Sequence, residues 1–183
     1  MMKFHVKQAV AFAAAVMCTL AFSPMAQAQG SAAPTDPQIA EIVVVANQID
    51  IDYAKLALKK SKDQNVRSFA EQMVRDHSTL LKSVEGLATK LHVTPVASDT
   101  SKSLEAQSKE TTAKLKALKG NAFDKAYVDN EVAYHAAVIN EVGNVLIPNA
   151  KNAELKSALE GAAPLFKGHL AHAEKIQASL NKN

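Results

Sequence analysis

The sequence predicts an all-α fold, a bundle of four long helices, and three observations support this prediction. Apolar residues recur at the i, i+3, i+4, i+7 spacing of an amphipathic helix through most of the chain after residue 36. Proline, glycine or a short polar run interrupts the pattern only at a few points. No stretch shows the sustained alternation of apolar and polar residues that is typical of a strand.

Residues 1–28 have the features of an export signal. A basic start with Lys3 and Lys7 is followed by an apolar run from Ala9 to Phe22 and by Ala26-Gln27-Ala28, an A-x-A cleavage site. The run is short and rich in alanine, so a permanent membrane anchor is not favoured. Retention as an amphipathic anchor is the alternative. Cleavage would leave a chain beginning at Gln29, which is long enough for one domain with a core.

Composition narrows the function classes. The only cysteine, Cys18, lies inside the predicted signal, which excludes a disulfide scaffold or a cysteine-based site in the rest of the chain. Lysine plus arginine (21) and aspartate plus glutamate (18) are interspersed, and aromatics make up 5% of the residues, so no nucleic-acid partner is expected. We expect a periplasmic or secreted protein, with outer-membrane association, an envelope protein partner and homo-oligomer formation left open.

The domain is expected to span residues 37–183, after a disordered lead-in at residues 29–36. Asp36 followed by Pro37 is an N-cap with proline at the first helical position, so the first helix should run from Pro37 to about Lys60. The polar run from Ser61 to Asn65 then breaks the pattern.

The clearest helix extends from about Val66 to Leu91, and His77 occupies a core position in its apolar series. Pro95 lies in the break that follows. Residues 99–119 are rich in lysine and glutamate with only a thin apolar stripe, which predicts a weakly buried helix that ends at Gly120 as its C′ glycine.

Two more helices complete the pattern. One is expected from about Ala122 to Leu146, followed by a turn at Pro148-Asn149, and its inner side includes Tyr127, Glu131 and His135. The last is expected from about Asn152 to Leu180 and places His169 on its apolar side. Pro164 lies inside it and should bend it, because proline removes a backbone N–H.

Helix lengths predict how the bundle is connected. The first two helices share a short break and should be antiparallel neighbours. Residues 99–119 would span about 30 Å as a helix, enough to carry the chain back along the bundle. The result is a four-helix bundle with a long, partly helical connection between its second and third helices, as in ferritin-like folds.

The inner polar residues then fall at similar depths. Asp50, His77, Glu131 and His135 lie about the same number of residues from the shared end of the bundle, whereas His169 is offset by roughly 7 Å. Helix tilt or the Pro164 bend would close that offset. Agreement in depth predicts one interior site.

Several segments resemble a bacterial secreted family called domain of unknown function 4142. The resemblance covers nearly the whole chain after the predicted signal and is carried by Asp50–Ala57, Val66–His77, Phe123–Tyr127 with Glu131 and His135, and Pro164 with His169-Leu170. It implies a ferritin-like helical fold and an exported protein, and it implies no established activity. Aspartates at positions 50 and 52 stand where relatives more often carry glutamate, and Glu131 stands where glutamine is common.

Two hypotheses account for the interior residues. In the first, His77, His135 and His169 bind a transition metal with Glu131 or Asp50 as an oxygen ligand, a set that suits Fe, Zn, Cu or Mn. In the second, the histidines hydrogen-bond to Asp50, Glu131 and Tyr127 and only hold the helices in register. The protein is accordingly predicted to bind or sense metal in the cell envelope, or to be a non-catalytic structural or interaction protein.

An enzymatic activity is not assigned. A di-iron oxidase needs a Glu-x-x-His pair on each of two helices, and here Val74 and Phe166 stand three residues before His77 and His169. No phosphate-binding loop, nucleophile elbow or H-E-x-x-H motif is present. Asp76 should point about 100° away from His77 toward Arg75 or Lys55, with a role in supporting the site left open.

Overall fold

The computed structural model describes residues 33–182, so the predicted signal and the first half of the predicted lead-in lie outside the described residues. Within this range the chain is helical and contains no strand, which confirms the all-α prediction. Its elements are α1 (Asp36–Lys60), α2 (Gln64–Lys90), α3 (Asp99–Ala117), α4 (Gly120–Glu141), a π-helical segment (Val142–Leu146), α5 (Ile147–Asn149) and α6 (Ala153–Leu180). No helix in the described range is long and apolar enough to cross a membrane.

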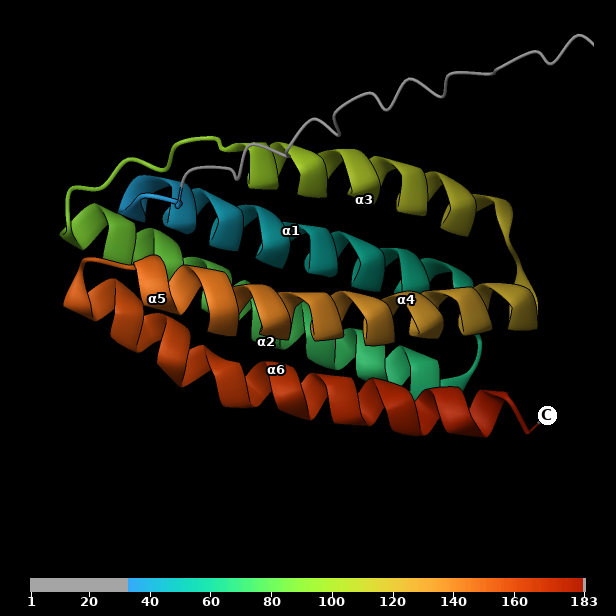
Figure 1. Ribbon diagram of the computed structural model, residues 1–183. Helices are drawn as coiled ribbons and strands as arrows, with labels where there is room; N and C mark the ends of the chain where they lie inside the picture. The colour runs from blue at the N-terminus through green and yellow to red at the C-terminus, as the bar shows by residue number, and fades with distance from the viewer. Residues whose placement is uncertain (1–32, 183) are drawn as a thin grey trace, which may run out of the picture. The chain divides into compact units, whose positions relative to one another are not determined.

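Helices α1, α2, α4 and α6 form the bundle, and α3 lies outside it along α1 (Figure 1). The α1–α2 pair and the α4–α6 pair are antiparallel hairpins that pack against each other. The long connection between α2 and α4 includes α3 and returns the chain along the bundle. The predicted four-helix bundle with a partly helical connection is thus confirmed.

The first helix begins differently from the prediction. Thr35, rather than Asp36, is its N-cap residue, and the Gln38 side chain accepts a hydrogen bond from the Thr35 backbone N–H at 2.9 Å. The Asp36 carboxylate instead accepts hydrogen bonds from the backbone N–H groups of Lys151 (2.8 Å) and Asn152 (2.9 Å). Asp36 therefore fastens the start of α1 to the loop before α6.

The predicted helix end at Gly120 is wrong. Helix α3 stops at Ala117 because Leu118 takes an extended conformation, and Gly120, with φ of 54°, begins α4. The second left-handed residue is His92, with φ of 53°, which follows the last turn of α2. There the Val93 N–H bonds to the Ala88 carbonyl at 2.9 Å, a Schellman-type ending in a position usually taken by glycine.

Prolines disturb the regular helix geometry of the α4–α6 hairpin. The predicted helix to Leu146 is interrupted at Val142, where the backbone widens into a π-helical segment and the Ile147 N–H bonds to the Val142 carbonyl. Pro148 follows, and its ring would clash with the carbonyl four residues earlier in a regular α-helix. Helix α6 continues through Pro164 as one helix of 28 residues and changes direction in its N-terminal half (Figure 1).

Two apolar clusters fill the interior on either side of the polar residues. One contains aromatic side chains, including Phe69, Phe123 and Tyr127, and the other is mostly aliphatic, with Ile42, Val142 and Leu159 among its members. On α2, α4 and α6 the inner histidine falls between members of the two clusters, and on α1 Asp50 lies among residues of the aromatic cluster. The polar residues therefore form one layer across the bundle.

We expect Gly120→Ala to lower the free energy of unfolding by about 1 kcal/mol, because its φ of 54° disfavours any residue with a Cβ. A Cβ at this position meets nothing within 4 Å, so backbone conformation alone is tested. Gly86→Ala is the matched control: it lies exposed inside α2, also with free space, and should raise the free energy of unfolding by up to about 1 kcal/mol. Urea unfolding measures the free energy of unfolding of both variants. A change of the same sign in the two variants would contradict the left-handed backbone conformation of Gly120.

Candidate metal centre

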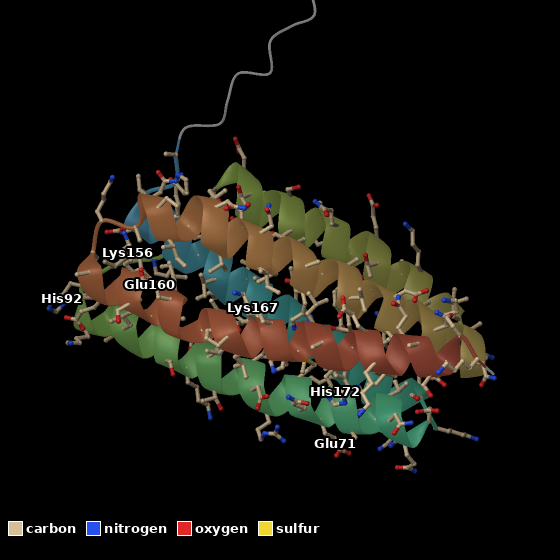
Figure 2. All side chains as sticks on the ribbon, turned by 60° about the horizontal axis from the view of Figure 1, so that its bottom comes forward. Glu71, His92, Lys156, Glu160, Lys167 and His172 are labelled. Atoms are coloured by element: carbon tan, nitrogen blue, oxygen red, sulfur yellow. The ribbon has the colours of Figure 1, made fainter. Side chains whose placement is uncertain are left out.

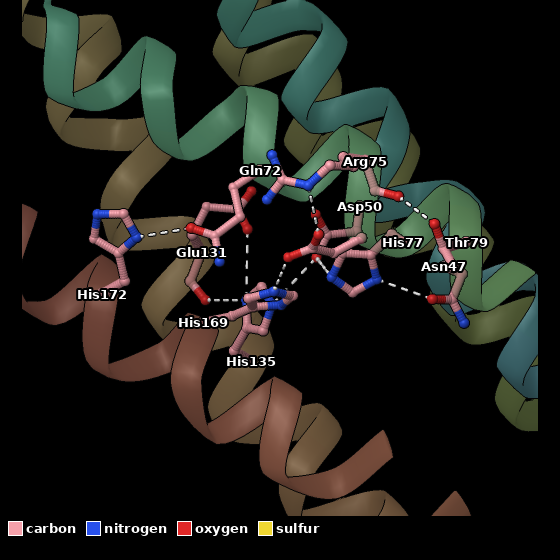
Figure 3. Close-up of polar contacts among 11 residues, drawn as sticks. Asn47, Asp50, Gln72, Arg75, His77, Thr79, Glu131, His135, His169 and His172 are labelled. Atoms are coloured by element: carbon pink, nitrogen blue, oxygen red, sulfur yellow. Dashed lines mark hydrogen bonds and ion pairs between the residues drawn. The ribbon is translucent and has the colours of Figure 1, made fainter. Parts of the chain in front are cut away.

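All five residues predicted for the site come together in one layer of the bundle (Figure 3). Helix α1 contributes Asp50, α2 contributes His77, α4 contributes Glu131 and His135, and α6 contributes His169. None is more than 4% exposed. One atom from each of the three histidines, and likewise one from each of Asp50, Glu131 and His135, lies within 4.8 Å of the others in its group.

The offset expected for His169 is not present. Its ring centroid lies 5.1 Å from that of His77 and 5.3 Å from that of His135, and the latter two are 5.7 Å apart. Helix α6 changes direction before it reaches this layer, which places His169 level with the other two rings.

His77 is oriented by a neighbour that the sequence analysis missed. Its Nδ1 lies 2.9 Å from the Asn47 side-chain oxygen, and the Asn47 amide nitrogen donates to the Val43 carbonyl at 2.8 Å. That second bond fixes the amide orientation, so the Asn47 oxygen must accept and His77 Nδ1 must carry the hydrogen. Asn47 lies three residues before Asp50, on the same helix face, which is the signal that could have revealed it.

The other two rings are held in the same way. His135 Nδ1 donates to the backbone carbonyl of Glu131 at 3.0 Å, and His169 Nε2 donates to the Asp76 carboxylate at 3.0 Å. Asp76 also accepts a hydrogen bond from Arg75 Nε at 3.0 Å. Burial alone raises the pKa of Asp76, but the hydrogen bond from His169 and the charge of Arg75 outweigh it and leave the pKa below its usual value.

The opposite nitrogens of the three rings face inward. His77 Nε2, His135 Nε2 and His169 Nδ1 are buried and have no hydrogen-bond partner in residues 33–182. The Asp50 carboxylate lies on their side of the rings: one of its oxygens is 3.3 Å from His77 Nε2 and 3.5 Å from His135 Nε2, without forming a hydrogen bond. The Glu131 carboxylate lies 3.5 Å from His135 Nδ1, on the other side of that ring.

Burial keeps the three imidazole rings neutral. It lowers the pKa of His77 to about 3 and that of His135 to about 4, and it lowers the pKa of His169 despite the opposing effect of Asp76. Burial also raises the pKa of Asp50 to about 8, and burial together with Asp50 raises that of Glu131. At neutral pH each imidazole is therefore neutral, with a free lone pair on its inward nitrogen.

Three further polar side chains make no hydrogen bond to the cluster. The predicted bond between a histidine and Tyr127 is wrong: the Tyr127 hydroxyl is buried and makes no hydrogen bond within the described residues. His172 pairs with Gln72 at 3.0 Å at the partly exposed boundary of α2 and α6 (Figure 2). His92 lies exposed at the end of α2 (Figure 2), far along that helix from the cluster.

The chain belongs to the family described as domain of unknown function (DUF4142), whose model matches residues 21–176. Two solved structures share its fold. The "putative secreted protein DUF305" of Streptomyces coelicolor has a TM-score of 0.67 at 13% identity, over 79% of this chain and 92% of that one. The protein CopM in its Cu(II)-bound form has a TM-score of 0.64 at 15% identity, over 80% of this chain and 98% of that one. Among curated proteins, none matches this chain.

The buried histidines make the metal-free protein sensitive to acid. The unfolded chain takes up a proton at His77 near pH 6.5, whereas the folded protein does so only near pH 3, so stability is lost as the pH falls through this interval. We expect His77→Gln to reduce the slope of unfolding free energy against pH there by up to about 1.4 kcal/mol per pH unit. Denaturant unfolding at a series of pH values measures this slope for the native protein and for the variant.

The exposed residue His92 provides the control, since His92→Gln alters no buried group and should leave that slope as it is. Equal slopes for the native protein and His77→Gln would mean that His77 is not protected from protonation in the folded state.

Proposed function

We propose that this member of the DUF4142 family binds one divalent transition-metal ion through His77, His135, His169 and Asp50. The observation that carries the proposal is the set of three inward ring nitrogens, which lack partners in the described part of the chain while the opposite nitrogen of each ring is held. Buried polar atoms normally have partners, because leaving them without one is costly. A single ion would satisfy all three nitrogens at once.

The positions of the two acids favour Asp50 as the oxygen ligand. Its carboxylate shares the side of the rings on which the free nitrogens lie, whereas Glu131 approaches the nitrogen of His135 that already donates to a carbonyl. Glu131 would then support His135 from outside the ligand set. The proposed ligand set is thereby reduced to three imidazoles and one carboxylate, a four-coordinate set without an open position.

The ligand chemistry narrows the choice of metal. Three imidazoles and one carboxylate favour Zn²⁺, Cu²⁺ or iron over Mn²⁺, which prefers oxygen ligands. Sulfur ligands, which select Cu⁺, are scarce: Met73, the only methionine in residues 33–182, packs in the aromatic apolar cluster, and the only cysteine, Cys18, lies in the predicted signal. The copper-bound form of CopM, a protein with the same fold, lends support to copper within this group.

The partners of the outward nitrogens support a metal site further. Metal-binding histidines usually donate their other N–H to a carboxylate, a carbonyl or a similar acceptor, which fixes the ring and raises its basicity. Asn47, the Glu131 carbonyl and Asp76 are three such acceptors, one for each ring. A closed and buried set of four protein ligands suits binding, storage or sensing of the ion rather than catalysis.

The proposed setting is the cell envelope. The signal features of residues 1–28 support export with cleavage after Ala28. The choice between the periplasm and the medium does not affect the metal site.

A structural role is the second candidate, and a specific observation favours it. His77 connects α2 to Asn47 on α1, and His169 connects α6 to Asp76 on α2, so the rings already bridge helices without an ion. In this alternative the inward nitrogens and the Asp50 carboxylate would contribute nothing to stability.

Expression of the complete gene without an affinity tag, in medium with mixed trace metals, tests the proposal. Native mass spectrometry of the purified protein is expected to show a chain that begins at Gln29 and carries about one metal ion. The double variant His77→Ala with His135→Ala should carry none. Asp76→Asn, which changes only the support of His169, should weaken metal affinity by about 10- to 100-fold.

His92→Ala and His172→Ala are the controls, because these histidines lie outside the cluster, and both should retain the metal. Metal well below one ion per chain in every sample would remove the metal proposal. In that case His77→Ala should still lower the free energy of unfolding by about 1–3 kcal/mol, through the loss of its bond to Asn47, and the structural role would remain.

Metal affinity should depend on pH through Asp50. Because burial raises the pKa of Asp50 to about 8, the ion must displace a proton from this carboxyl at lower pH. We expect Zn²⁺ affinity to rise by up to about tenfold per pH unit between pH 6 and 8 and then to level off. Competition titration against a chromophoric chelator measures the Zn²⁺ affinity at each pH. Asp50→Asn should bind more weakly and show little of this dependence, and an unchanged slope in that variant would exclude Asp50 as a ligand.

A further inference from the structure

A cavity of about 450 Å³ occupies the aliphatic half of the bundle, between the two helical hairpins and beneath α3. All five long helices contribute to its lining, and most of the contributed side chains are apolar: Ile42, Val84, Leu104, Val142, Leu159 and Phe166. Protein interiors rarely leave voids larger than a water molecule. A space of this size falls within the range of small-molecule binding sites.

The cavity is accessible from outside and extends to the histidine layer. Exposed residues Ala137 on α4 and Ala158 on α6 belong to its lining, so it reaches the surface. Asn47, Tyr134 and Phe166 line both this cavity and a small void against His77 and His135. A molecule in the cavity would therefore lie beside the cluster.

The charge of the lining restricts what the cavity can hold. Glu141 is its only charged side chain, and neither lysine nor arginine takes part. A carboxylate or phosphate group would lose its hydration without gaining a countercharge, which is costly. An uncharged ligand meets no such penalty.

Polar groups gather on the α3 side of the lining. Gln107, Ser108 and Thr111 on α3 face this space together with Tyr53 on α1 and Asn130 on α4. The Asn130 amide nitrogen is buried and has no hydrogen-bond partner among the residues that the structure describes. This side of the cavity is polar, whereas the α2 and α6 side is mostly apolar.

We propose that the cavity binds one uncharged, mostly apolar small molecule whose polar end lies on the α3 side. A helix of a protein partner, with a diameter of about 10 Å, is too wide for a space enclosed by five helices. None of the four proposed metal ligands lines the cavity, so the metal-free protein should bind the molecule as well.

Three probes of equal chain length test the proposal: 1-dodecanol, dodecanoate and dodecylammonium, each titrated calorimetrically into the full chain. We expect saturable binding of 1-dodecanol with one molecule per chain and binding of the two charged probes weaker by at least about tenfold. Ala137→Phe, which fills the cavity from its mouth, should weaken 1-dodecanol binding by at least about tenfold. The matched control is Ala136→Phe, a change at the exposed preceding residue of α4, outside the lining, and it should leave binding unchanged.

Circular dichroism of both variants verifies that they are folded. The proposal is overturned by the absence of saturable 1-dodecanol binding, by dodecanoate binding as tightly as 1-dodecanol, or by equal losses in Ala136→Phe and Ala137→Phe. It is also overturned if sedimentation shows a dimer that Ala137→Phe abolishes, because the cavity would then belong to an interface between two copies of the chain.

Discussion

The structure depends on how three neutral imidazoles are accommodated in a dry interior. One nitrogen of each ring donates to a fixed acceptor, namely Asn47, the Glu131 carbonyl or Asp76, and the second nitrogen of each ring has no hydrogen-bond partner in residues 33–182. Burial opposes protonation of the rings and ionisation of Asp50, so the layer is neutral without an ion. In the proposed metal complex, Asp50 would lose its proton and the three rings would supply their inward lone pairs to the ion.

The two halves of the bundle differ in packing. This difference decides from which half a small molecule can approach the layer of buried histidines and acids. Phe69, Phe123 and Tyr127 close one half with buried aromatic rings. The other half is aliphatic and contains the large cavity. The π-helical segment before Pro148 and the bend of α6 both lie in this second half, so the proline-induced irregularities occur where the hairpins leave space between them.

The neighbours with known structures share the architecture but little of the sequence, at 13% and 15% identity. Such a likeness shows the fold and does not identify ligand residues. The proposed metal site therefore rests on this chain's own side chains: three histidines on three helices, an aspartate on a fourth, and the acceptors that orient the rings.

Sequence periodicity by itself determined the helices, the helical connection at residues 99–119 and the common depth of Asp50, His77, Glu131 and His135, because these follow from local spacing and a fixed rise per residue. Only the tertiary structure decided that Asp50 is buried while Asp52 is exposed, since a small error in helix phase exchanges them. It also decided that Asp76 reaches across to His169, because such contacts depend on how neighbouring helices are rotated and on where α6 bends. Which ring nitrogen faces inward depends on acceptors from the rest of the fold, and local sequence does not encode that choice.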